Sequence, residues 1–92
     1  ESFQSKLNLY RKELDLIDSN LLDILSDRMV VAEGIGRLKH QENVAILQSS
    51  RWSDILSTMI DTGKSKGLSE EFIEEVFKAI HVESINIQHN VK

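Results

Sequence analysis

Apolar residues recur at helical spacing through the first forty positions of the chain. Leucine, isoleucine, valine and tyrosine return every three or four residues, and no proline interrupts them. This pattern predicts one long helix from about Phe3 to His40. Its apolar positions are Leu7, Tyr10, Leu14, Ile17, Leu21, Ile24 or Leu25, Val31, Ile35 and Leu38.

A second, shorter helix is predicted after a break in the pattern. The periodicity fails between Gln41 and Ser49, and we expect Ser49 or Ser50 to cap a helix that runs to about Thr62. Gly63 is the expected stop, and the segment GKSKGL that it opens has the composition of a turn. The apolar positions of this helix are Trp52, Ile55, Leu56, Met59 and Ile60.

A third helix is predicted from Ser69 to about His89. Ser69 has the chemistry of an N-cap, and Glu70 and Glu71 follow it in the first turn, where the helix dipole favours acids. Two polar residues interrupt the apolar face near its end. These are Ser84 and Gln88, four positions apart and therefore on one side of the helix. The apolar face comprises Phe72, Ile73, Val76, Phe77, Ile80, Ile85 and Ile87.

The order of one long and two shorter helices predicts an all-α, three-helix subunit forming a single domain over residues 1–92. A helix of about 35 residues is roughly 50 Å long, whereas a compact domain of this size has a radius of gyration of about 12 to 13 Å. The chain cannot cover so long a helix by itself. A homodimer is therefore expected, because a second copy would bury the far half.

Composition and charge narrow the function classes. The absence of cysteine excludes disulfides and thiol chemistry, and suits a cytoplasmic protein. The formal charge of -4 argues against general binding of nucleic acid or of an anionic membrane. The short apolar runs exclude a membrane span, and no signal-peptide pattern opens the chain. Because the chain starts at Glu1 without methionine, we expect it to be a processed or excised piece of a longer protein.

Three cations on the long helix are candidates for binding an anionic ligand. Arg28 and Lys39 are eleven positions apart, which places them within about 20° of each other and about 16 Å apart along the axis. Between them Gly34 and Gly36 remove side chains and would let a ligand or another backbone come close. Arg11 points about 100° away and lies about 25 Å from Arg28. In an antiparallel pair of helices it would reach the pocket of the partner.

Each of these features also has an ordinary structural explanation. The cations can be solvated, with their stems over the apolar stripe. The two glycines would then serve tight helix packing, and Trp52 would anchor the core. Ser84 and Gln88 would be exposed polar positions near the end of a helix.

No pattern of metal ligation or covalent catalysis is present. The histidines His40, His81 and His89 have neither the i, i+4 spacing nor the acidic neighbours of a zinc signature. There is no nucleophile motif and no glycine-rich phosphate loop. We therefore expect no metal and no cofactor. An enzyme built from this chain would act by positioning a ligand and stabilising charge.

Four elements in order resemble the all-helical (AroQ-class) chorismate mutase family across nearly the whole chain. They are LYRKELDLIDSNLLDILSDR, IGRLK, the turn at Arg51 and the closing ESINIQ. The resemblance implies an intertwined homodimer of three-helix subunits. It also implies conversion of chorismate to prephenate by a [3,3] rearrangement without cofactor, metal or covalent intermediate.

The resemblance also implies a role for each matching residue. Arg28 would bind one substrate carboxylate, and Arg11 of the partner subunit would bind the other. Lys39 would lie at the second carboxylate and the ether oxygen, and Gln88 would be the second donor to that oxygen. Arg51 and Ser84 match positions that line the same pocket.

Two positions depart from the family pattern. Family members commonly carry acids where this chain has Gln48 and Trp52, the latter a glutamate that receives the ring hydroxyl of chorismate. An indole N–H cannot accept that hydrogen bond, so Gln48 is the expected replacement through its amide oxygen or its main chain. The segment QSSRW looks like mutase domains fused to 3-deoxy-arabino-heptulosonate 7-phosphate synthase, which implies that synthase as a fused or associated partner.

Chorismate mutase is thus the function that the sequence predicts, within phenylalanine and tyrosine biosynthesis. Two alternatives stay open. Isochorismate pyruvate lyase has the same fold and much the same cations. A noncatalytic helical dimerisation or regulatory module would leave Arg28 and Lys39 merely solvated.

Overall fold

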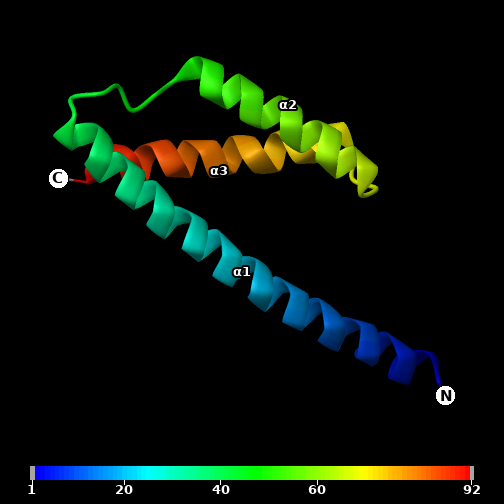
Figure 1. Cartoon of the computed structure of the whole chain (residues 1–92). Helices are drawn as coiled ribbons and strands as arrows, with labels where there is room; N and C mark the ends of the chain where they lie inside the picture. The colour runs from blue at the N-terminus through cyan, green and yellow to red at the C-terminus, as the bar shows by residue number, and fades with distance from the viewer. Residues whose placement is uncertain (1, 92) are drawn as a thin grey trace. The chain divides into compact units, whose positions relative to one another are not determined.

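The computed structural model is all-helical over the residues that it describes, 2–91. Its elements are α1 (Phe3–Gln41), α2 (Ser49–Ser65) and α3 (Glu70–Asn90), shown in Figure 1. The predictions of an all-α fold and of a long first helix are confirmed. Glu1 and Lys92, the two ends of the predicted domain, lie outside the described residues. No helix within 2–91 combines the length and the hydropathy that crossing a membrane requires.

The chain divides into two compact units, and the division falls inside α1. The first unit ends at Val30 and the second begins at Val31. In the first unit an apolar stripe follows one side of the helix at three- and four-residue spacing. Its members Leu14, Ile17 and Leu21 are 51–58% exposed. An apolar stripe of this kind is normally covered by another protein surface.

The second unit contains the end of α1 together with α2 and α3. Helices α2 and α3 pack against each other and are joined by a short turn, as Figure 1 shows. The most buried apolar side chains of this unit are Ile73 and Ala32, which are 2% and 3% exposed. Ile73 packs on Gly63, where a Cβ atom would overlap the Cδ1 atom of Ile73. A Cβ atom here would force the Ile73 side chain to shift, so glycine lets this side chain pack closely against α2.

Two overlapping backbone hydrogen bonds end α1 just beyond His40. The N–H of Val44 donates to the carbonyl of Lys39 at 2.9 Å, and the N–H of Asn43 donates to the carbonyl of His40 at 3.3 Å. Asn43 has a φ of 55°, the left-handed conformation that this C-terminal motif requires. The helix therefore ends one residue after the predicted boundary.

The expected start of α2 is wrong. The residue at the N-cap is Gln48, whose side chain makes no capping hydrogen bond, and Ser49 and Ser50 lie within the first turn. The first intrahelical bond runs from the N–H of Trp52 to the carbonyl of Gln48 at 3.2 Å. A serine after a break satisfies the sequence rule for a cap, but here the helix begins one residue earlier.

The expected end of α2 is wrong as well. Gly63 lies inside the helix, which ends at Ser65, and the glycine in the left-handed conformation just beyond the end is Gly67, whose φ is 87°. The N–H of Leu68 donates to the carbonyl of Gly63, and that of Gly67 donates to the carbonyl of Lys64. Both glycines fit the pattern of a helix stop, and only the packing on α3 distinguishes them. At the start of α3 the prediction is confirmed, since the hydroxyl of Ser69 accepts from the N–H of Phe72 at 3.3 Å.

Candidate functional site

Lys39, in the last turn of α1, is the cation at the centre of the candidate site. Its ammonium donates to the main-chain carbonyl of Ile46 at 2.7 Å and to Gln88 Oε1 at 2.9 Å. Helix C-termini favour cations because their carbonyl groups carry partial negative charge. The loop after α1 and the end of α3 together fix the direction in which this long side chain extends.

Ser84 and Gln88 lie one turn apart on α3 and are both buried. They are 9% and 5% exposed, so the interpretation of these residues as ordinary exposed polar positions is wrong. Gln88 Nε2 donates to Ser84 Oγ at 3.3 Å. Within residues 2–91 no buried side-chain nitrogen or oxygen lacks a hydrogen-bond partner. Lys39, Ser84 and Gln88 therefore form one connected polar group, which we call the Lys39 cluster.

The backbone of α3 approaches α1 closely at Gly36. A Cβ atom on Gly36 would lie 2.7 Å from the Cα atom and 3.0 Å from the carbonyl oxygen of Gln88. This glycine therefore serves helix packing. A Cβ atom on Gly34 would meet nothing within 4 Å among the described residues.

His40 contacts the same residue of α3. Its Nε2 atom lies 3.1 Å from the main-chain oxygen of Gln88. From the sequence, His40 is weighed only against a zinc signature, which it does not match, and it receives no role in the site. The spacing of His40 four positions after Gly36, on the same side of α1, is the signal that could have found it.

Three further predicted residues lie at the beginning of α2. Gln48 and Arg51 are exposed, and neither side chain forms a hydrogen bond within the described part of the chain. Trp52 is half-buried and stacks on His81 of α3, with ring centroids 4.1 Å apart and planes 16° from parallel. Trp52 therefore helps to join α2 to α3, as the interpretation of a core anchor expects.

Arg11 and Arg28 belong to the first unit and are not members of the Lys39 cluster. Neither forms an ion pair with a carboxylate of residues 2–91. Both guanidinium groups thus keep their donors for water or for a ligand. Guanidinium groups suit carboxylates because two N–H groups can match the two oxygens.

The Lys39 cluster presents positive charge that no carboxylate of residues 2–91 neutralises by an ion pair. The two acceptors that Lys39 contacts, an amide oxygen and a peptide carbonyl, carry no net charge. An ammonium with neutral partners retains its attraction for an anion, and partial burial strengthens that attraction. No group of three histidine, aspartate or glutamate side chains within 2–91 is arranged to hold a metal ion. The chemistry available here is charge stabilisation and hydrogen bonding.

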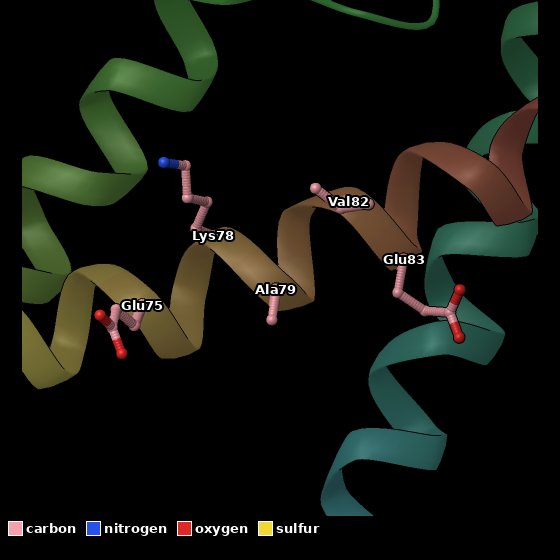
Figure 2. Close-up of a pocket in the computed structure, with 5 residues that line it drawn as sticks. All are labelled: Glu75, Lys78, Ala79, Val82 and Glu83. Atoms are coloured by element: carbon pink, nitrogen blue, oxygen red, sulfur yellow. The ribbon is translucent and has the colours of Figure 1, made fainter.

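A shallow hollow on another side of α3 is separate from this cluster. Figure 2 shows its lining, which combines charged and apolar side chains of this one helix. These positions lie on the side of α3 opposite to Ser84 and Gln88. The hollow is therefore no part of the candidate site. The lining residues are Glu75, Lys78, Ala79, Val82 and Glu83.

Comparison with known proteins gives a consistent result. A family model described as chorismate mutase type II matches residues 10–89. The chain is 30% identical over 84 residues to a bifunctional chorismate mutase/prephenate dehydratase of Buchnera aphidicola, and 28% identical over 83 residues to the T-protein of Haemophilus influenzae. It spans 22% of the length of each of these two relatives.

Two other similar proteins match over most of their own length. A 4-amino-4-deoxychorismate mutase of Streptomyces venezuelae is 28% identical over 85 residues, which are 92% of this chain and 82% of that protein. A solved structure of a conserved hypothetical protein from Pyrococcus furiosus has a TM-score of 0.74 and 30% identity. That match covers 96% of this chain and 99% of the other.

Proposed function

We propose that this chain, which belongs to the chorismate mutase type II family, isomerises chorismate to prephenate in the biosynthesis of phenylalanine and tyrosine. The reaction is a [3,3] rearrangement within one molecule, in which a carbon–oxygen bond breaks while a carbon–carbon bond forms. It needs no nucleophile, because all bonding changes occur within the substrate. What a protein can contribute is a fixed substrate conformation and stabilisation of the developing charge.

The observation that carries this proposal is the Lys39 cluster. The Lys39 ammonium lies 2.9 Å from the amide oxygen of Gln88, and its two contacts within residues 2–91 are to uncharged oxygens. Two groups so close together can both donate to a single oxygen of a ligand. The ether oxygen of chorismate is such an acceptor, because it gains negative charge as its bond to carbon breaks.

In the proposed mechanism Lys39 and Gln88 act mainly on the transition state. A donor that is held in place before the reaction stabilises the growing charge more than it stabilises the ground state. Lys39 would also contact one substrate carboxylate. Gln88 has two amide hydrogens, of which Ser84 takes one, so the other is available for the ether oxygen. Ser84 would orient the amide.

Arginines would bind the substrate carboxylates, with one supplied by a second subunit. We assign Arg28 to one carboxylate and Arg11 of the partner subunit to the other. This assignment is supported by the absence of ion pairs at both residues within 2–91 and by the exposed apolar stripe of the first unit. A second copy of the chain would cover that stripe and bring in Arg11. Arg51 would line the same pocket.

Recognition of the ring hydroxyl of chorismate is assigned to Gln48. Its exposed side chain makes no hydrogen bond within residues 2–91, so its amide oxygen can serve as an acceptor. Trp52, at the position where the family commonly has a glutamate, stacks on His81 and therefore has a packing role instead of a polar one. The loss of a carboxylate here would make the site less selective for the substituent at this ring carbon.

Substrate choice is the first experiment. Purified protein should be offered chorismate, isochorismate and 4-amino-4-deoxychorismate, the last because a relative carries that compound in its name. We expect prephenate from chorismate at the highest kcat/KM. Release of pyruvate from isochorismate at a higher kcat/KM would assign the chain to the lyase reaction instead. Preference for the amino compound would change the substrate but keep the rearrangement.

The noncatalytic alternative predicts a different outcome. A helical dimerisation module would turn over none of the three compounds. It would also gain no thermal stability from a bicyclic analogue of the transition state, because only a protein that binds the analogue is stabilised by it. A rise in melting temperature that saturates with analogue concentration, and that Lys39→Ala abolishes, would support the proposed site.

The wider setting of the protein is part of the proposal. We place it in the cytoplasm, where aromatic amino acids are made, and a chain without cysteine suits that compartment. The relative from Buchnera aphidicola combines mutase and prephenate dehydratase in its name. That partner differs from the synthase that the QSSRW segment implied, and fusion or association with the synthase stays a prediction.

A further inference from the structure

Three consecutive contact points on one side of α1 meet a single residue of α3. Gly36, Lys39 and His40 are spaced three and four positions apart, so they lie together on the helix surface. Gly36 faces the Cα atom of Gln88, His40 lies 3.1 Å from its main-chain oxygen, and Lys39 donates to its side-chain oxygen. The backbone and the side chain of Gln88 are thus each held by a different group.

The main-chain bond satisfies a carbonyl that has no partner inside its helix. Since α3 ends at Asn90, the carbonyl of Gln88 is among the last four of the helix. The imidazole of His40 can donate to it from Nε2, both in the neutral form protonated at that nitrogen and in the charged form. This contact therefore locks the last turn of α3 against α1.

From this geometry we infer that His40 is a positioning residue for Gln88. It fixes the main chain of Gln88, so that the amide held by Lys39 keeps its direction toward the reacting oxygen, and it does not touch the substrate. The inference rests on the proposed function only in giving Gln88 a substrate to act on. A displacement of about 1 Å at a reacting group can cost a large factor in rate, which is why such support matters.

Steady-state kinetics give the first test. We expect His40→Ala to lower kcat roughly 3- to 10-fold, the factor for one ordinary hydrogen bond, with little change in KM. His40→Gln, which keeps an N–H donor, should recover most of the loss, whereas His40→Phe, which keeps a ring but lacks a donor, should not. His89→Ala is the matched control, an exposed histidine of α3, and should behave as the parent protein.

A double-mutant cycle separates positioning from simple structural support. In a Gln88→Ala background the carbonyl remains but the amide is gone, so His40→Ala should lower the melting temperature as before while reducing kcat no further. Equal losses of kcat in both backgrounds would overturn the inference. So would full activity in His40→Phe.

A measurement that needs no turnover keeps this inference separate from the mutase proposal. The side-chain amide of Gln88 can be followed by ¹⁵N relaxation in the folded protein. We expect its order parameter to fall in His40→Ala and His40→Phe and to return in His40→Gln. An order parameter unaffected by all three variants would overturn the positioning role even if the enzyme were active. If the order parameter falls in the variants as expected but the parent protein has no mutase activity, only the mutase proposal is overturned.

Discussion

The ammonium of Lys39 donates to the side-chain oxygen of Gln88 at 2.9 Å, although 49 positions separate the two residues in the chain. This bond directs the amide oxygen of Gln88 toward the cation and its nitrogen toward Ser84. Each of the two residues therefore determines how the other presents itself to a ligand. The predictions that follow test that relationship and the assembly around it.

Removal of either cation assigned to the substrate should cost much more activity than removal of a remote one. We expect Lys39→Ala and Arg28→Ala each to lower kcat/KM by at least about 100-fold, the usual scale for losing a group that stabilises the transition state. The measurement is prephenate formation at several chorismate concentrations. Lys66→Ala and Lys64→Ala, in the turn region at the end of α2, are the matched controls and should change kcat/KM less than 2-fold. Comparable losses in both sets would show that the site is elsewhere.

Replacing the amide of Gln88 by a carboxyl group should make activity depend on pH. An amide donates at every pH, so the parent protein should remain active from neutral to mildly alkaline conditions. In Gln88→Glu the side chain donates only when protonated, and an unperturbed glutamate has a pKa of about 4.3. When ionised it would also pair with Lys39 and neutralise its charge. The variant should therefore work best in acid and lose activity as the pH rises.

The test is a profile of kcat against pH for both proteins. An active Gln88→Glu protein with the profile of the parent would remove Gln88 from the mechanism. Gln41→Glu is a suitable companion, because it adds the same charge at an exposed position to which the proposal gives no contact with the substrate.

Adding one methyl group should distinguish the two glycines near the end of α1. A Cβ atom on Gly36 would lie 2.7 Å from the Cα atom of Gln88, so the backbones must separate, at a cost of about 1 to 3 kcal/mol. Gly34 has open space, and alanine there improves helix propensity by up to about 1 kcal/mol. We expect Gly36→Ala to lower both the melting temperature and kcat, and Gly34→Ala to lower neither. Thermal melts and measurements of kcat for the two variants, compared side by side, decide this.

The isolated chain should be a homodimer with a large apolar interface. The stripe that includes Leu14, Ile17 and Leu21 is more than half exposed in the first unit, and a stripe of this size is costly to leave in water. Sedimentation at micromolar concentration should give twice the chain mass. A folded monomer at that concentration would contradict the proposed assembly, and with it the role of Arg11 in a neighbouring subunit.

Mixing two inactive variants should restore activity if subunits share their pockets. Arg11→Ala and Arg28→Ala homodimers should each be nearly inactive. After joint unfolding and refolding, a mixed dimer has one pocket without either arginine and one complete pocket. Random pairing makes about half the dimers mixed, so activity should approach about a quarter of the parent value. Mixtures that are dimeric yet no more active than the separate variants would refute the shared pocket.

The helices and their approximate boundaries could be predicted because the interactions that form them are local. The spacing of apolar residues in α1 and the capping hydroxyl of Ser69 both act within a few positions. The end of α2 was misplaced for the same reason. Gly63 and Gly67 are equally good helix stops locally, and only the packing of Ile73 on Gly63 distinguishes them.

The candidate site likewise combines residues that local patterns identify with groups that only tertiary contacts bring in. Local patterns identified Lys39, Ser84 and Gln88 as unusual polar positions and supplied the resemblance to a family. They did not identify His40 or the main-chain carbonyl of Ile46, which contact this cluster. Sequence patterns cannot single out one peptide carbonyl, because every residue has one.

The sequence by itself determined three helices, the polar residues on their surfaces and the family to which the chain belongs. Periodicity, caps and motifs determine these features, and each of them depends on neighbours along the chain. Only the tertiary structure decided that Gly36, Lys39 and His40 all meet Gln88. That meeting depends on how closely the end of α1 approaches α3 and on the path of the loop between α1 and α2. Both follow from packing between residues that are distant in the sequence, which no local pattern records.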